Sequence, residues 1–175
     1  AGMAFAGAVR VAPLGDRAGE AGVDFAPGAG LRPQRLPALY HRAGADFTVT
    51  AILDGAEASS YRGALELSAA EGMIQAVNAL DLQSYLLGVV GAEMPAYFEA
   101  EALAAQAIVS RTFALYNIER ARSNAQPGVF RATTGFQVYK GFSAETRSTR
   151  KAVVETRGQA LSWGGALFSS YFHST

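Results

Sequence analysis

The sequence contains no cysteine, and this absence removes several kinds of site at once. Without cysteine there is no disulfide, no thiolate ligand for a metal and no cysteine nucleophile. Histidine is almost as scarce, with 2 residues among 175. Because a structural zinc site typically needs four converging ligands and a catalytic one three, we expect neither a metal site nor a cofactor.

Neither sign of charge is in excess. The 15 Lys and Arg residues balance the 15 Asp and Glu residues, so the formal net charge is zero. Such a chain lacks the basic surface on which nucleic-acid binding depends, and we expect no nucleic-acid partner. The short basic run over 147–151 is typical of a solvated helix face. No apolar run reaches the ~20 residues of a membrane-spanning helix, so we expect no membrane span.

Half of the residues are hydrophobic, which is enough to bury one sizeable core. We therefore expect a single domain over 1–175. Its first part, 1–60, is rich in strand and loop signals, and the segments that carry chemistry fall within 61–175. The expected fold class is α+β, with mixed strands packed around two main helices and a hairpin at the C-terminal end.

Four segments before residue 80 have the composition of strands. Val, Ile, Thr and Phe are frequent in 45–53, and the shorter segment 8–13 alternates as a strand does. Two more strands are expected at 61–67 and 73–77, joined by a turn at Gly72. The long stretch from Gly15 to Pro37 is rich in Gly and Pro and is expected to be a loop.

The first main helix is expected over 82–92, directly after Asp81, whose side chain is a good N-cap. Apolar residues recur at the spacing of one helix face, at Leu82, Tyr85, Leu86, Val89 and Val90. Pro95 disfavours the α conformation at Met94 and so ends the helix. Glu93 therefore falls at a junction of helix and loop, where a side chain can point into a cleft.

The second main helix is expected over 99–122. Its apolar face consists of Leu103, Ala104, Ala107, Ile108, Leu115 and Ile118. Arg111 lies on the same face, so its guanidinium should be buried. Because an unpaired buried charge is costly, Arg111 needs a carboxylate or several carbonyl oxygens as partners, and its apolar surroundings favour a structural ion pair.

The segment 136–139 is expected to be a strand that ends at Gly141. Ser143 should then cap a further helix that runs to about Thr156 and stops at Gly158. These boundaries come from local signals alone.

A β-hairpin is expected from 159–163 and 166–173, over a turn at Gly164 and Gly165. Alternation along the second strand gives one face that ends in polar residues and one that stays apolar. The polar face ends with Tyr171 and His173, and the apolar face, which should pack on the core, contains Phe168 and Phe172.

Glu93 is the best candidate for chemistry. Its apolar neighbours in sequence would partly shield it from water and favour its protonated form, which a general acid requires. Read on its own, a Glu beside a Pro is more often an exposed loop residue. His173 has a comparable alternative, as a histidine that hydrogen-bonds the backbone at a sheet edge. No Gly-x-Ser-x-Gly elbow or phosphate-binding loop is present.

Six segments in a fixed order exceed what local patterns explain. They are YRGALEL (61–67), NALDLQSYLLGVVGAEMP (78–95), EALAAQAIVSRTFALY (101–116), TTGFQVYKG (133–141), AVVETRGQALSWGG (152–165) and YFHST (171–175). Together they resemble the stage II sporulation protein D / amidase-enhancer family of bacterial cell-wall proteins. The resemblance covers 61–175 well and the first sixty residues only loosely.

The resemblance implies a lytic transglycosylase, which cuts the β-1,4 bond between N-acetylmuramic acid and N-acetylglucosamine in peptidoglycan without using water. The family's catalytic glutamate, in the Glu-Met-Pro motif, corresponds to Glu93. Its other recurring residues would shape or line the cleft. They correspond to Gln106, Arg111, Gln137, Tyr139, Tyr171 and His173.

Two departures from the family pattern limit what is carried over. Some members hold zinc through His and Cys residues before the Gln-x-Tyr motif, and the stretch 123–136 contains neither. The family pattern also continues beyond His173-Ser174-Thr175 into a Gly-rich segment, so we expect this sequence to have been trimmed there.

A function that is not enzymatic stays open as an alternative. Amidase-enhancer relatives are described as modifiers of a separate autolysin, so the chain could be a non-catalytic wall-binding partner of a cell-wall amidase. In either reading the expected partner is the glycan strand, including strands without stem peptides. The expected location is the bacterial cell envelope, with export or tethering through a segment that this sequence does not include.

Overall fold

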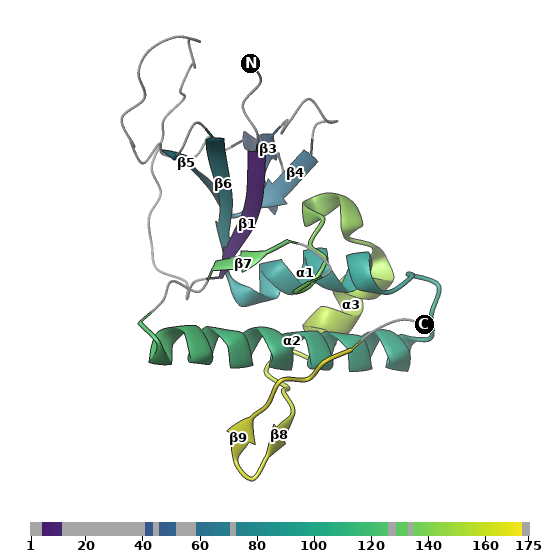
Figure 1. Cartoon of the computed structure of the whole chain (residues 1–175). Helices are drawn as coiled ribbons and strands as arrows, with labels where there is room; N and C mark the ends of the chain where they lie inside the picture. Colours follow the sequence, from purple (N-terminus) through teal and green to yellow (C-terminus); the bar gives the residue numbers. More distant parts are fainter. Residues whose placement is uncertain are drawn as a thin grey trace.

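The computed structural model describes residues 5–11, 41–43, 46–51, 59–70, 73–125, 129–132 and 135–172. Its helices are α1 (Leu82–Glu93), α2 (Ala100–Ser123), α3 (Arg147–Glu155) and the 3-10 helix η1 (Gly141–Ala144). Figure 1 shows the longer strands gathered on one side of α1, with α2 running back along its other side. The α+β class and the two main helices are confirmed. Within these ranges, no helix is long and apolar enough to cross a membrane.

The longer strands form two sheets. The first has the order β5-β6-β1-β7 and the second the order β2-β3-β4. The strands of the first sheet are β1 (Phe5–Val11), β5 (Ala64–Ala70), β6 (Met73–Leu80) and β7 (Val129–Arg131). Those of the second are β2 (His41–Ala43), β3 (Asp46–Ala51) and β4 (Ser59–Arg62). β1 runs parallel to β6, and the other pairings are antiparallel, so the first sheet is mixed.

The strand signals before residue 80 are confirmed, with one change. The strand expected over 61–67 is divided at Gly63 between β4 and β5, which belong to different sheets. Gly63 has a φ of 75°, and a Cβ there would collide with the carbonyl oxygen of Ala79. The backbone can change sheets here because glycine tolerates both the positive φ and the close approach. The loop expected over 15–37 lies outside the described residues.

Both ends of α1 follow from local chemistry. Oδ1 of Asp81 accepts hydrogen bonds from the amides of Gln83 at 2.9 Å and Ser84 at 3.1 Å, so Asp81 is the expected N-cap. Met94, before Pro95, is extended, with φ −133° and ψ 131°. Asp81 directly follows β6, and α1 therefore begins where the first sheet ends.

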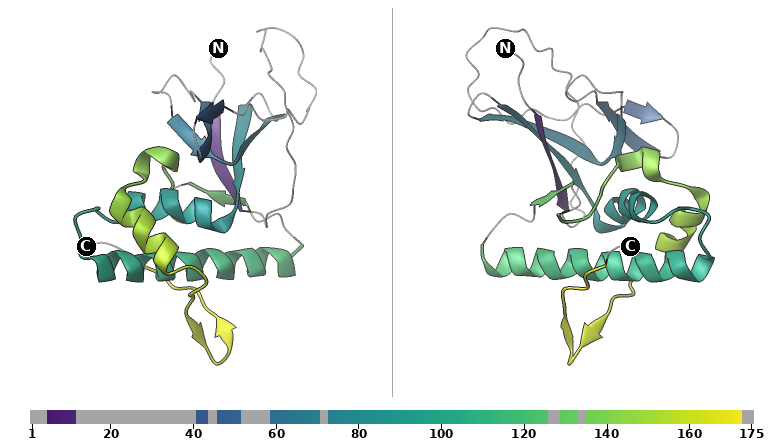
Figure 2. Two further views of the ribbon diagram at one scale, coloured as in Figure 1. Left: turned by 180° about the vertical axis from the view of Figure 1, so that it is seen from behind. Right: turned by 45° about the vertical axis from the view of Figure 1, so that its right-hand side comes forward.

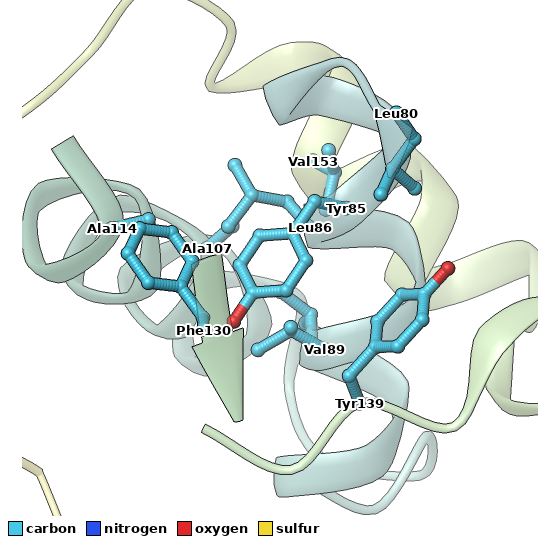
Figure 3. Packing of buried hydrophobic residues seen from close by; sticks show 10 residues of the cluster. Leu80, Tyr85, Leu86, Val89, Ala107, Ala114, Phe130, Tyr139 and Val153 are labelled. Atoms are coloured by element: carbon cyan, nitrogen blue, oxygen red, sulfur yellow. The ribbon is translucent and has the colours of Figure 1, made fainter. Parts of the chain in front are cut away.

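The apolar face of α1 lies at the centre of the core. Tyr85, Leu86, Val89 and Val90 are all buried. They pack with Leu80, Ala107, Ala114, Phe130, Tyr139 and Val153, which come from α2, α3, β7 and neighbouring segments (Figure 3). The face predicted from the spacing of apolar residues is thus the surface on which the other helices assemble.

Two expectations for the segment 136–156 are wrong. The segment 136–139 is not a strand, and backbone amides here bond to α1 instead. The amide of Val138 donates to the Glu93 side chain at 2.6 Å, and the next residue after the segment, Lys140, donates to the carbonyl of Gly88 at 3.4 Å. Ser143 does not cap a helix, since it lies in η1 and its hydroxyl donates to the carbonyl of Lys140. The N-cap of α3 is Thr146, in a capping box with Thr149.

The C-terminal hairpin is confirmed at its turn but is much shorter than expected. Its strands are β8 (Ser162–Trp163) and β9 (Ala166–Leu167). Beyond β9 the chain bends towards α2, where the hydroxyl of Ser170 donates to the carbonyl of Val109 at 2.9 Å. Alternating strand faces therefore do not apply to 168–172. Phe168 is exposed, contrary to expectation, and Phe172 is half-buried against Phe113.

Gly88 and Gly91 let the segment that follows Gln137 lie against the backbone of α1. A Cβ at Gly88 would lie 2.5 Å from the ring of Tyr139, and one at Gly91 would overlap the carbonyl oxygen of Ala144. The two glycines are three residues apart and so share a helix face. Their missing side chains allow 139–144 to pack directly on the helix that ends in Glu93.

Gly91→Ala is expected to lower the free energy of unfolding by about 1–3 kcal/mol, because the added methyl group meets a backbone carbonyl that cannot rotate away. This loss would be opposite in sign to the usual effect of Gly→Ala within a helix, which stabilises by ~0.5–1 kcal/mol. Urea denaturation of both proteins measures the difference. A more stable variant would show that η1 does not pack on α1 as closely as described.

Candidate functional site

Glu93 is the last residue of α1 and remains partly exposed. Its Oε1 atom accepts a hydrogen bond of 2.6 Å from the amide of Val138. The expected position at the junction of helix and loop is confirmed. The side chain is turned towards the segment 136–139, so one oxygen is held by the protein. Within the described part of the chain, Oε2 has no hydrogen-bond partner.

Gln137 holds this segment in place from inside the protein. It is fully buried, and its Oε1 accepts from the hydroxyl of Tyr85 at 3.0 Å. Its Nε2 donates to the carbonyl of Ser110 at 3.3 Å. Gln137 therefore ties α1 to α2, one residue before the amide that binds Glu93. Both the oxygen and the nitrogen of the Gln137 side-chain amide are bonded within the protein. Gln137 therefore contributes to the arrangement by positioning Val138.

Gln106 belongs to the same polar group. It lies one turn before Ser110 on α2, is nearly buried, and donates from Nε2 to the Ser110 hydroxyl at 3.0 Å. The side chain of Gln106 and the amide of Gln137 thus meet at Ser110. This brings together two of the residues predicted for the site.

Tyr139 lies beside Tyr85, and the two rings stack with centroids 5.5 Å apart (Figure 3). Its hydroxyl donates to Oδ1 of Asn78 at 2.7 Å. Burial raises the pKa of Tyr139 and of Tyr85, and for Tyr85 nearby Tyr139 and Glu93 raise it further. Both hydroxyls therefore stay protonated at neutral pH and act as steady hydrogen-bond donors.

Arg111 points away from this group. It is 2% exposed and donates from Nη1 to the carbonyl of Gln159 at 3.0 Å. Its Nη2 donates to the carbonyl of Val153 at 3.1 Å and to the hydroxyl of Thr156 at 3.2 Å. The expected ion pair is wrong: among the described residues no carboxylate pairs with Arg111, and carbonyl oxygens take that place. Burial without a counter-charge lowers the pKa of the guanidinium.

Tyr171 is exposed and does not lie on a strand. Its ring meets the edge of Phe113 at 5.8 Å, and Phe113 in turn meets Phe136 at 4.9 Å. Tyr171 is therefore connected to Phe136, the residue before Gln137, through the ring of Phe113. His173 lies outside the described residues, and its place in the site stays a prediction.

Sequence reasoning missed the partners that hold the site together. The spacing of apolar residues places Tyr85 on the apolar face of α1, which is correct for its ring but gives no sign of the hydrogen bond that its hydroxyl donates to Gln137. Asn78 and Ser110 had no distinguishing pattern. The Val138 amide that binds Glu93 is a backbone group, which side-chain motifs do not reveal. Among the described residues, no cluster of three or more His, Asp or Glu side chains could hold a metal ion.

Tyr85→Phe is expected to lower the free energy of unfolding by about 1–3 kcal/mol, because it leaves the buried Oε1 of Gln137 without its donor. Chemical denaturation measures the change. Tyr116→Phe is the matched control: this residue of α2 is half-buried, and its hydroxyl has no partner in the part of the chain that is described. It should change stability by less than ~0.5 kcal/mol. Equal losses in both variants would contradict the described contact.

The chain is similar in sequence to several known bacterial proteins. The stage II sporulation protein D of Bacillus subtilis is 36% identical over 114 residues, which cover 58% of this chain and 33% of that protein. The amidase enhancer of the same organism is 38% identical over 90 residues, or 51% of this chain and 12% of the relative. An uncharacterised protein of Brachyspira hyodysenteriae is 34% identical over 112 residues, 64% of this chain and 30% of that protein.

The chain thus spans about a third or less of the length of the curated relatives it matches. Among solved structures, no significant match was found. The SpoIID family model, described as stage II sporulation protein, matches residues 70–163, which is more than half of the 175 residues. This range includes β6, the three α-helices and the residues around Glu93. The chain belongs to the SpoIID family.

Proposed function

We propose that the chain is a lytic transglycosylase that cleaves the β-1,4 bond between N-acetylmuramic acid and N-acetylglucosamine in peptidoglycan, with Glu93 as acid and base. The observation that carries the proposal is the state of the Glu93 carboxyl group. One oxygen is fixed at 2.6 Å by the Val138 amide, and the side chain remains partly exposed at the end of α1. A group that is fixed and also accessible suits proton transfer to a bound substrate.

The reaction needs only one carboxyl group. Glu93 first gives its proton to the glycosidic oxygen, and the bond from that oxygen to C1 of N-acetylmuramic acid breaks. The C6 hydroxyl of the same sugar attacks C1, and the Glu93 carboxylate takes the hydroxyl proton. The product carries a 1,6-anhydro end, and Glu93 is protonated again. Most other glycosidases need two carboxyl groups because they also activate water or form a covalent intermediate.

The two oxygens of Glu93 suit the two halves of this cycle. The amide of Val138 can donate only to an acceptor, so Oε1 is the oxygen that stays unprotonated. The proton therefore belongs on Oε2. When Glu93 is a carboxylate, the hydrogen bond at Oε1 stabilises its charge until Oε2 takes up the next proton. Gln137 and Tyr85 support this arrangement by fixing the segment that carries the amide.

A second function is favoured by one comparison. A relative that is 38% identical over 90 residues is named amidase enhancer. In this alternative the chain binds the wall and assists an amidase without cutting glycan itself. Both functions place the protein in the bacterial cell envelope, with the glycan strand as its partner.

Product analysis separates the two functions. The chain is incubated with purified glycan strands, with and without stem peptides, and the soluble products are examined by mass spectrometry. A lytic transglycosylase yields fragments with anhydro-muramyl ends that are lighter than hydrolysis products by one water. Intact strands, together with faster release of stem peptides when a cell-wall amidase is added, would overturn the proposal in favour of the enhancer.

A further inference from the structure

The loop that follows Glu93 presents two aromatic rings to solvent. Tyr97 is 84% exposed and Phe98 43% exposed, although both lie between two well-packed helices in the sequence. Their ring centroids are 5.2 Å apart and their planes are inclined by 65°, so the two rings form a corner. Large exposed aromatic side chains that contact each other are a common mark of a binding surface.

The backbone beneath these rings is held in place. The amide of Phe98 donates to the carbonyl of Pro95 at 3.1 Å, which closes a turn. The hydroxyl of Ser148, on α3, donates to the carbonyl of Ala96 at 2.8 Å. The loop is thus tied to a neighbouring helix just before Tyr97. A surface whose backbone is ordered in advance loses less entropy when it binds a ligand.

The rings also lie close to Glu93. Tyr97 follows Glu93 by four positions in the sequence, which limits the distance between their Cα atoms to about 15 Å. The exposed Trp163, by contrast, lies in the hairpin of β8 and β9. Figures 1 and 2 show that hairpin projecting from α2 on the side away from α1. The Tyr97–Phe98 pair is therefore within reach of a short ligand bound at Glu93, and Trp163 is not.

Charge around the loop limits what can bind there. The stretch 93–101 contains Glu93, Glu99 and Glu101 and no Lys or Arg. Glu99 and Glu101 are exposed beside the rings. The loop itself therefore offers no positive charge to an anionic membrane or to the carboxylate of a muramic acid residue without a stem peptide. A neutral pyranose fits, because its C–H groups can pack on the electron-rich face of an aromatic ring.

We propose that Tyr97 and Phe98 form a subsite that stacks on a neutral N-acetylglucosamine ring of the strand bound at Glu93. The inference rests on the proposed function for the identity of the strand. One ring takes the face of the sugar, and the other closes the corner against its edge. The subsite fixes the register, because it places N-acetylglucosamine on the aromatic pair and leaves the muramic acid residue for Glu93.

Binding of soluble N-acetylglucosamine oligomers tests the subsite apart from cleavage. The titrations use the full chain in the Glu93→Gln background, so that no strand is cut. Tyr97→Ala and Phe98→Ala should each weaken binding by about 2- to 10-fold, as expected for loss of one aromatic contact. Tyr97→Phe should bind as the parent does, and Tyr97→Leu should resemble Tyr97→Ala. Trp163→Ala removes an equally exposed aromatic ring far from Glu93 and should have no effect.

The outcomes distinguish this inference from the proposed function. Oligomers that bind the parent and both alanine variants equally, or that do not bind the parent at all, overturn the subsite. Anhydro products from the wild-type chain would leave the proposed function standing in that case. Weakened binding in the variants with no anhydro product from the wild type would support the subsite and overturn cleavage. If the variants instead lose only the ability to stimulate an amidase, the pair is a protein contact and the subsite is wrong.

Discussion

Glu93→Gln is expected to lower the rate of glycan cleavage by about 10²- to 10⁴-fold, the usual contribution of a general acid. The amide has nearly the shape of the carboxyl group but has no proton to give to the glycosidic oxygen. Turnover is measured by release of anhydro-muramyl products from purified strands. Affinity for the strand should be retained, so the loss should appear in kcat more than in KM.

The variant should fold normally, since its carbonyl oxygen can still accept from the amide of Val138, as Oε1 does in the wild type. Glu119→Gln is the matched control, because it removes an exposed carboxylate from the far part of α2. It should leave both melting and turnover unchanged. Unchanged turnover in a folded Glu93→Gln protein would remove Glu93 from the catalytic role.

Arg111→Ala should lower the free energy of unfolding by ~3 kcal/mol or more, because it removes charge-assisted hydrogen bonds and leaves a cavity in place of a large buried side chain. The carbonyl groups of Val153 and Gln159 would lose their donor. The loss differs in origin from that of a broken ion pair, because no carboxylate is left buried and unpaired. Denaturant titration measures the effect.

Two further variants separate charge from shape at this position. Arg111→Lys retains the charge, but an ammonium group lacks the planar fork that bonds two separate carbonyl groups at once. This variant should therefore retain most of the loss in the free energy of unfolding. Arg111→Met fills part of the space without a charge and should fall between Ala and wild type. Arg120→Ala, at an exposed position of α2, should cost less than ~1 kcal/mol. Normal melting of Arg111→Ala with loss of glycan binding would instead place Arg111 in the substrate site.

Features that depend on neighbouring residues in the sequence were predicted well. Asp81 and Pro95 define the ends of α1 through bonds and steric limits within a few residues. The same holds for the apolar face of α1 and for the turn of the hairpin. Glu93 could therefore be placed at the end of a helix from the sequence alone.

Features that depend on distant contacts could not be predicted. The segment 136–139 has the composition of a strand, but the amides of Val138 and of the following Lys140 bond to Glu93 and Gly88, which lie more than forty residues earlier. Ser143 and Thr146 are both good N-caps, and the packing of η1 against α1 decides between them. Arg111 requires a partner, yet only the fold shows that carbonyl oxygens of α3 and of the segment after it take that place.

The central claim is cleavage by Glu93 without water, and cleavage in water labelled with a heavy oxygen isotope tests it most directly. Wild-type chain and Glu93→Gln are incubated with peptide-free glycan strands in labelled water, and the new ends are examined by mass spectrometry. We predict anhydro ends without label from the wild type and none from Glu93→Gln. Labelled reducing ends, or new ends formed equally by both proteins, would contradict the account.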